Sequence, residues 1–149
     1  MIDEPTRELL QECVRRESRS LLQYVREVPV WVAPADRATL AKLRDLARAE
    51  QQAADELGRY LQKHQAGLAG LGPYPGSFTT VNDVALAYLL PRLVREQRAA
   101  VAALEADAAR LADPEARAHL ERLAAVKRRH LPELEALHAT PHTLTGAAG

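Results

Sequence analysis

The chain of 149 residues has little cysteine, few aromatic residues and no charge excess, and each shortage excludes a class of protein. The single cysteine, Cys13, rules out an internal disulfide and a cysteine-based zinc site. Aromatic residues make up 4% of the chain, which is too few for a typical β-sandwich. Lys plus Arg and Asp plus Glu number 20 each, so the zero net charge argues against a general nucleic-acid binder.

Long apolar runs are also missing. No apolar stretch approaches the ~20 residues that span a bilayer, and the acidic segment 1–5 lacks the apolar core of a signal sequence. The chain has neither a glycine-rich phosphate loop nor a GxSxG motif. We therefore expect a cytoplasmic protein with no nucleic-acid partner and no membrane partner.

What the chain does contain favours an all-α domain. Ala, Leu, Arg and Glu dominate the sequence, and these residues have high helix propensity. Apolar residues recur at steps of three and four, which is typical of amphipathic helices. The helices are expected at residues 5–27, 36–66, 80–111 and 113–138, followed by a flexible tail over 139–149. Pro91 lies inside the third expected helix and should kink or split it.

The lengths of the connections predict the topology. The first and third connections are short, so each joins two helices into an antiparallel hairpin. Residues 67–79 hold four glycines and two prolines and form a loop. Thirteen extended residues reach at most ~45 Å, about the length of a 30-residue helix. The loop can therefore cross the bundle lengthwise and join two hairpins, as in ferritin-like bundles.

The connection between the first two expected helices is apolar. It includes the segment Val28–Val32, which holds the only tryptophan, Trp31. We expect this segment to fold over one end of the bundle or to contact a protein partner.

Polar residues interrupt the apolar seams near the middles of all four expected helices. They are Glu17, Glu50, Glu96 and the pair Lys127 and His130. A charge in an apolar seam is costly unless a metal ion, an opposite charge or hydrogen bonds satisfy it. Charges at one height on four helices therefore predict a shared site inside the bundle.

These positions give the chain a resemblance to a known superfamily. The relevant residues are Glu17 followed by Tyr24, the segment 49–57, Glu96 and the segment 127–131. The pattern resembles the ferritin-like superfamily, particularly its bacterioferritin- and rubrerythrin-like branches. The resemblance covers about residues 5–138.

The resemblance implies a four-helix bundle with a carboxylate-rich metal site. Its ligands would be Glu17, Glu50, Glu96 and His130, the metal would be iron or manganese, and Tyr24 would lie just outside the ligands.

The sequence departs from the family pattern at two positions. Ala53 stands where the family has a histidine, and Lys127 stands where it has a glutamate. An ammonium group among carboxylates can replace part of a metal ion's charge. Four interpretations stay open: a metal-free polar core closed by a salt bridge, a remodelled one-metal site, a complete di-metal site, and a different topology in which these residues never meet.

Three hypotheses for function follow. The first is a scaffold or interaction protein without a cofactor, functioning as a homodimer. The alternative is a metal-binding oxidoreductase or iron-handling protein that uses the remodelled carboxylate and histidine site. The third is a helical regulator with no inherited site. The sequence leaves open whether the protein is an enzyme.

Overall fold

The described part of the chain is all-helical. The computed structural model describes residues 2–30, 32–82 and 84–142, and these residues contain no β-strand, which confirms the all-α prediction. The helices are α1 (Glu4–Ser18), α2 (Leu21–Glu27), η1 (Pro34–Asp36), α3 (Arg37–Lys63), η2 (Gly76–Val81), α4 (Leu86–Ala109) and α5 (Pro114–Ala139). None of the helices in these ranges has the length and apolarity needed to cross a membrane.

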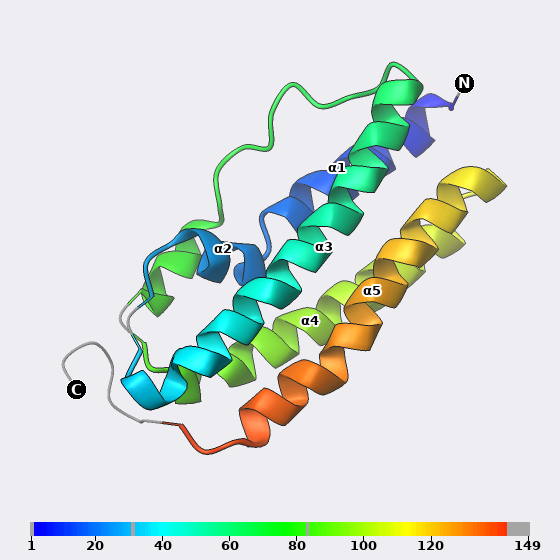
Figure 1. Ribbon diagram of the computed structural model, residues 1–149. Helices are drawn as coiled ribbons and strands as arrows, with labels where there is room; N and C mark the ends of the chain where they lie inside the picture. The colour runs from blue at the N-terminus through cyan, green and yellow to red at the C-terminus, as the bar shows by residue number, and fades with distance from the viewer. Residues whose placement is uncertain (1, 31, 83, 143–149) are drawn as a thin grey trace.

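The helices form two antiparallel pairs (Figure 1). In one pair α1 and α2 run against α3, and in the other α4 runs against α5. The segment between α3 and η2 runs back along the outside of the bundle, so α4 starts at the end where α3 starts (Figure 1). Helices α3 and α4 are therefore parallel, and α3 also packs on α5.

The first expected helix is broken at Arg19. Its backbone leaves the helical region (φ −117°, ψ 28°), and Ser20 then starts α2 as its N-cap. The Ser20 hydroxyl accepts a hydrogen bond from the backbone N–H of Gln23 at 3.2 Å. The prediction of one helix over 5–27 is therefore wrong, because a serine side chain competes with helical continuation at this position.

The third expected helix begins later than predicted. Gly76–Val81 forms a 3₁₀ segment, in which the hydroxyls of Thr79 and Thr80 donate to carbonyls three residues earlier, each at 2.9 Å. These local bonds stabilise tight turns instead of an α-helix. Pro91 lies in the second turn of α4, and the helix continues through it, so the expected split does not occur.

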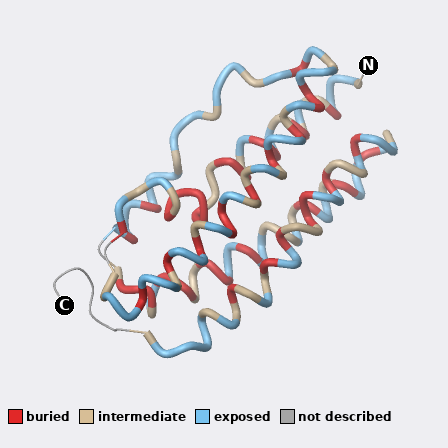
Figure 2. The backbone as a smooth tube through the Cα atoms, in the orientation of Figure 1, coloured by how far each residue is buried: buried red, intermediate tan, exposed pale blue. Residues whose placement is uncertain are grey.

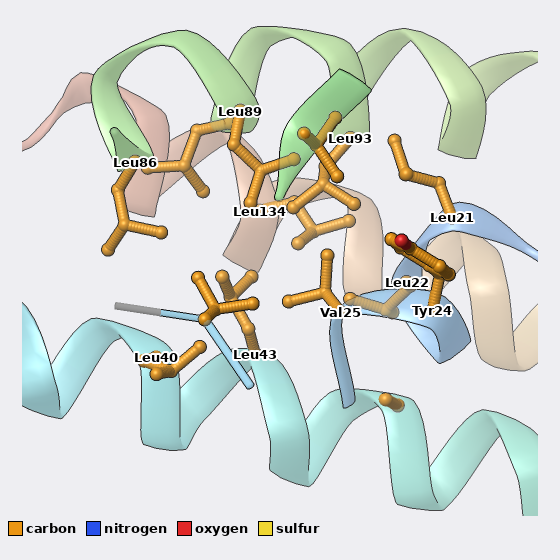
Figure 3. Packing of buried hydrophobic residues seen from close by; sticks show 14 of the residues in the cluster. Leu21, Leu22, Tyr24, Val25, Leu40, Leu43, Leu86, Leu89, Leu93 and Leu134 are labelled. Atoms are coloured by element: carbon orange, nitrogen blue, oxygen red, sulfur yellow. The ribbon is translucent and has the colours of Figure 1, made fainter. Parts of the chain in front are cut away.

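Buried positions recur along each long helix (Figure 2). The apolar ones gather in two clusters on either side of a polar layer. One cluster holds Leu43, Leu90 and Leu134, and Figure 3 shows part of it. The other holds Leu57 and Leu120. Along each of α3, α4 and α5, buried polar residues separate the members of one cluster from those of the other. Burying each leucine stabilises the fold by about 1.5–3 kcal/mol, and the clusters fix the height of the polar layer.

The apolar segment after α2 and the start of the C-terminal segment both contact the bundle. Val30 is buried in the first cluster, and Val28 and Val32 pack against it, so these valines fold over the bundle end. Trp31 lies outside the described residues. At the other end of the chain, His142 contacts Asp36 and the Leu137 carbonyl, so the start of the predicted tail 139–149 touches the bundle, while 143–149 lie outside the described residues.

Candidate functional site

Lys127 lies at the centre of the polar layer. Its side chain comes from α5 and is 2% exposed. The ammonium nitrogen lies 2.9 Å from Glu17 Oε2, contributed by α1, and 2.8 Å from Glu50 Oε1, contributed by α3. One ammonium group therefore joins three helices inside the bundle.

The second oxygen of Glu50 is also fully engaged. Gln97 of α4 donates from Nε2 to Glu50 Oε2 at 2.7 Å, and His130 Nδ1 lies 2.7 Å from the same oxygen. The Gln97 amide also donates to the backbone carbonyl of Lys127 at 3.0 Å. With these bonds α4 joins the other three helices, and we call Glu17, Glu50, Gln97, Lys127 and His130 the central network.

The charges in the central network stabilise one another. Burial raises the pKa of Glu50, but the Lys127 ammonium and the hydrogen bonds from His130, Lys127 and Gln97 outweigh burial and lower it below 4.5. Burial lowers the pKa of Lys127, but Glu17 and Glu50 outweigh it and raise the pKa above 10.5. Both groups are therefore ionised at neutral pH, although both are buried.

Glu17 is less completely satisfied than Glu50. Within the described residues its Oε1 has no hydrogen-bond partner, and neither has the nearby Arg16 Nε. These two atoms lie 3.8 Å apart, which is too long for a hydrogen bond. The other end of the Arg16 guanidinium donates from Nη2 to Asp107 Oδ2 at 3.1 Å. At one edge of the central network, an acceptor and a donor thus form an ion pair with each other but have no hydrogen bond within the described part of the chain.

The structure brings together four of the predicted polar residues and excludes the fifth. Glu17, Glu50, Lys127 and His130 meet, but the Glu96 side chain is 49% exposed and lies 4.0 Å from Arg92. The expectation that Glu96 faces the bundle axis is therefore corrected, because Gln97 occupies that position on α4. Helical periodicity allows both readings, since a step of three from Leu93 leads to residue 96 and a step of four leads to residue 97.

Tyr24 does not contact the central network. Its hydroxyl donates to Asn82 Oδ1 at 2.5 Å, and its ring packs against Tyr74 and Phe78 with centroid distances of 5.3 and 5.8 Å. Figure 3 shows Tyr24 among the apolar side chains. The expected position of Tyr24 just outside the ligands assumed an unbroken helix, whereas the break before Ser20 puts Tyr24 on a separate helix, α2.

The side chains present do not fit a di-metal centre. Three of the predicted ligands, Glu17, Glu50 and His130, remain in the network, and an ammonium group lies within hydrogen-bond distance of both carboxylates. In the described ranges, no group of three His, Cys, Asp or Glu residues is arranged to hold a metal ion. A metal ion at this position would be repelled by Lys127 and would have to displace it.

Fold and site together define an all-α bundle held at its centre by a buried ionic network. Comparisons of the chain with protein-family models, with curated proteins and with solved structures found no match.

Proposed function

We propose that the protein is a ferritin-like helical bundle that works as a non-catalytic scaffold or interaction protein. In this proposal a lysine–carboxylate network stands where the family has two metal ions. The observation that carries it is the position of the Lys127 ammonium, 2.9 Å from Glu17 and 2.8 Å from Glu50. A cation fixed by the protein itself links the two carboxylates and takes the place of a metal ion between them.

The positions of the polar residues support the ferritin-like part of the proposal. Each of α1, α3, α4 and α5 contributes to the central network at mid-height, and a long crossover joins two antiparallel helix pairs. This is the connectivity and the placement of inward polar residues that ferritin-like di-metal bundles use. Gln97 takes the place that a family glutamate would hold on the third long helix.

The alternative function, a metal-binding oxidoreductase or iron-handling protein, has less support. Iron or manganese would need the carboxylate oxygens that now bind Lys127. The pKa of Lys127 is raised above 10.5 after the two glutamates outweigh burial, so the side chain keeps its positive charge at neutral pH. Releasing it would leave an ammonium group without a partner in the core, which costs several kcal/mol.

Metal content separates the two functions. Protein purified from cells grown with added iron and manganese is expected to carry no stoichiometric metal by elemental analysis. Stoichiometric metal in the wild type that is lost in Glu50→Gln would overturn the scaffold proposal.

A gain-of-binding variant tests the family assignment separately. Ala53→His, Gln97→Glu and Lys127→Glu together restore the family's ligand set on the same helices, and we expect this variant to bind iron or manganese. The matched control carries Ala53→His and Lys127→Met and lacks two of the carboxylates. Absence of metal from the folded triple variant would count against the ferritin-like assignment.

The homodimer and the protein partner at Val28–Val32 stay predictions. Val28, Val30 and Val32 contribute to the chain's own core, so less of this segment is left for a partner. Tyr88 on α4 is 61% exposed and offers an aromatic side chain for such a contact.

A further inference from the structure

A half-open pocket of about 670 Å³ lies between α1 and α4. It is bounded by the end of α1, by α2, by the middle of α4 and by the crossover segment that leads into η2. Helix α1 packs mainly on α3 and α4 packs mainly on α5, so these two helices leave space between them. The volume falls in the range of about 300–1,000 Å³ that is usual for small-molecule sites.

The walls of the pocket are apolar. Leu21 and Leu22 line it from α2, Leu93 from α4, and Phe78 from η2. Ala100 lines it from α4 with a side chain too small to fill it. The walls therefore suit a hydrocarbon chain, whose transfer out of water is favourable.

The inner end of the pocket is polar, but its polar groups already have partners. It is formed by Glu17, Gln97 and Lys127, each at most 5% exposed. Glu17 and Lys127 pair with each other at 2.9 Å. The Gln97 amide nitrogen donates both to Glu50 Oε2 and to the Lys127 carbonyl. Because these groups hold the central network together, a charged group on a ligand has to be recognised at the rim.

The charged side chains around the rim are paired, with one exception. Oppositely charged groups lie within 4.0 Å of each other in three pairs: Glu12 with Arg15, Arg16 with Asp107, and Glu96 with Arg92. The exception is Arg19, which lines the pocket and has no carboxylate partner within the described part of the chain. Arg19 is half-buried and lies four residues after Arg15, on the same side of α1. The rim therefore carries one positive charge that the protein does not balance locally.

The Arg19 guanidinium is held in place by its neighbours. Its Nε donates to the Gly72 carbonyl at 2.8 Å, and its Nη1 donates to the Ser18 carbonyl at 3.3 Å. The group also lies 4.8 Å from the centre of the Tyr74 ring. Arginine has five N–H groups, and Nη2 of Arg19 makes no hydrogen bond within the described residues. An oriented guanidinium with N–H groups to spare is well suited to bind a carboxylate.

We propose that this pocket binds a single hydrocarbon chain with one carboxylate head group. The chain lies against the apolar walls, and the carboxylate accepts hydrogen bonds from Arg19 Nη2 at the rim. One unbalanced positive charge matches one negative charge, so a hydroxyl head group leaves Arg19 unneutralised and an ammonium head group is repelled by it. The site does not depend on the metal content of the central network, so its failure would leave the scaffold proposal standing.

A head-group series tests the proposal on the wild-type protein. The probes are decanoate, 1-decanol and decylamine, measured by isothermal titration calorimetry at neutral pH below their micelle-forming concentrations. We expect saturable binding of decanoate at one site, at least about tenfold tighter than 1-decanol, because a charged acceptor makes stronger hydrogen bonds to a guanidinium. Absence of saturable decanoate binding overturns the proposal. Equal or tighter binding of 1-decanol or decylamine overturns the assigned head group.

A second measurement separates a free carboxylate from a membrane surface. The protein is sedimented with vesicles of dioleoylphosphatidylglycerol, which carry anionic head groups on two-chain lipids. We expect no co-sedimentation, because the pocket takes one chain. Binding to the vesicles without binding to decanoate overturns the proposal.

Replacing Arg19 tests the assigned contact. Arg19→Gln is expected to bring the affinity ratio of decanoate to 1-decanol close to one. Binding of 1-decanol needs no charge, so it reports any effect of the variant on the wall at Gly72. The matched control is Arg48→Gln, since Arg48 is 60% exposed on α3 and does not line the pocket, and it should keep the wild-type ratio. A wild-type ratio in Arg19→Gln overturns the contact.

A pair of variants on α4 locates the binding. Ala100→Trp fills the pocket and is expected to abolish decanoate binding, whereas Ala102→Trp places the same side chain at an exposed position that does not line the pocket and is expected to leave binding unchanged. Far-UV circular dichroism checks that the variants are folded. Unchanged binding in folded Ala100→Trp would overturn the assignment to this pocket, and the head-group series decides the proposal if a variant does not fold.

Discussion

Replacing Lys127 with methionine removes the ammonium group from the central network and keeps most of the side-chain volume. Glu50 retains His130 and Gln97 as partners, but Glu17 loses its one hydrogen bond at Oε2 and keeps only the 3.8 Å contact to Arg16. Lys127→Met is therefore expected to lower the free energy of unfolding by about 3–5 kcal/mol, the usual cost of a buried charge left without its partner. A loss of this size is a large fraction of the stability of a typical domain.

Urea denaturation followed by far-UV circular dichroism at neutral pH measures this loss by linear extrapolation. The matched control is Lys42→Met, since Lys42 is 46% exposed and pairs with Glu133 at 2.9 Å on the surface. The control is expected to cost no more than about 1 kcal/mol.

A triple variant tests whether the lost charge balance causes the effect. Adding Glu17→Gln and Glu50→Gln to Lys127→Met removes all three charges and is expected to recover most of the loss. The reasoning is refuted if Lys127→Met costs no more than Lys42→Met, or if the triple variant is less stable than the single one.

Two further predictions concern ionisation. The folded-state pKa of Lys127 is raised above 10.5, so the stability that its charge contributes is complete below pH 10.5 and is lost as the pH rises through the folded-state pKa. The folded-state pKa of Glu50 is lowered below 4.5, so the stability that its charge contributes is present above pH 4.5 and is lost as the pH falls through the folded-state pKa. The difference in the free energy of unfolding between wild type and Lys127→Met should therefore be largest between these two pH values. Urea denaturation at a series of pH values measures this difference, and a difference that stays constant at both extremes of pH would contradict the prediction. Burial raises the pKa of the fully buried Cys13 to about 12, so Ellman's reagent is expected to label it in urea but not in the native protein at mildly alkaline pH. Rapid labelling of the native protein would show that Cys13 is accessible.

Much of the central network could be predicted from the sequence because its polar residues interrupt apolar patterns that can be recognised within a single helix. Glu50, Lys127 and His130 interrupt regular apolar seams on long helices, and a charge at such a position must find a partner inside the bundle. Glu96 and Gln97 show the limit of this argument. The two residues are adjacent on α4, and the apolar spacing of that helix is compatible with either one facing inward. Only the packing of α4 against α5 decides that Gln97 does so.

The broken first helix shows a second limit. Ser20 carries a recognisable N-cap signal, but the same serine is also tolerated inside a helix, so its presence alone does not stop one. The consequence is large, because the break moves Tyr24 from the central network to Asn82 and the aromatic cluster at η2.

The sequence by itself determined that the chain is helical, where the long helices α3 and α5 lie, and that charged groups are buried at their middles. These properties follow from propensity and periodicity, which depend on residues a few positions apart. Tertiary structure alone decided that Lys127 bridges Glu17 and Glu50, that Gln97 joins them, and that a pocket lies between α1 and α4. Distances of a few ångströms between side chains 30 to 110 residues apart depend on how whole helices pack, and that packing reflects the sum of many weak contacts across the core.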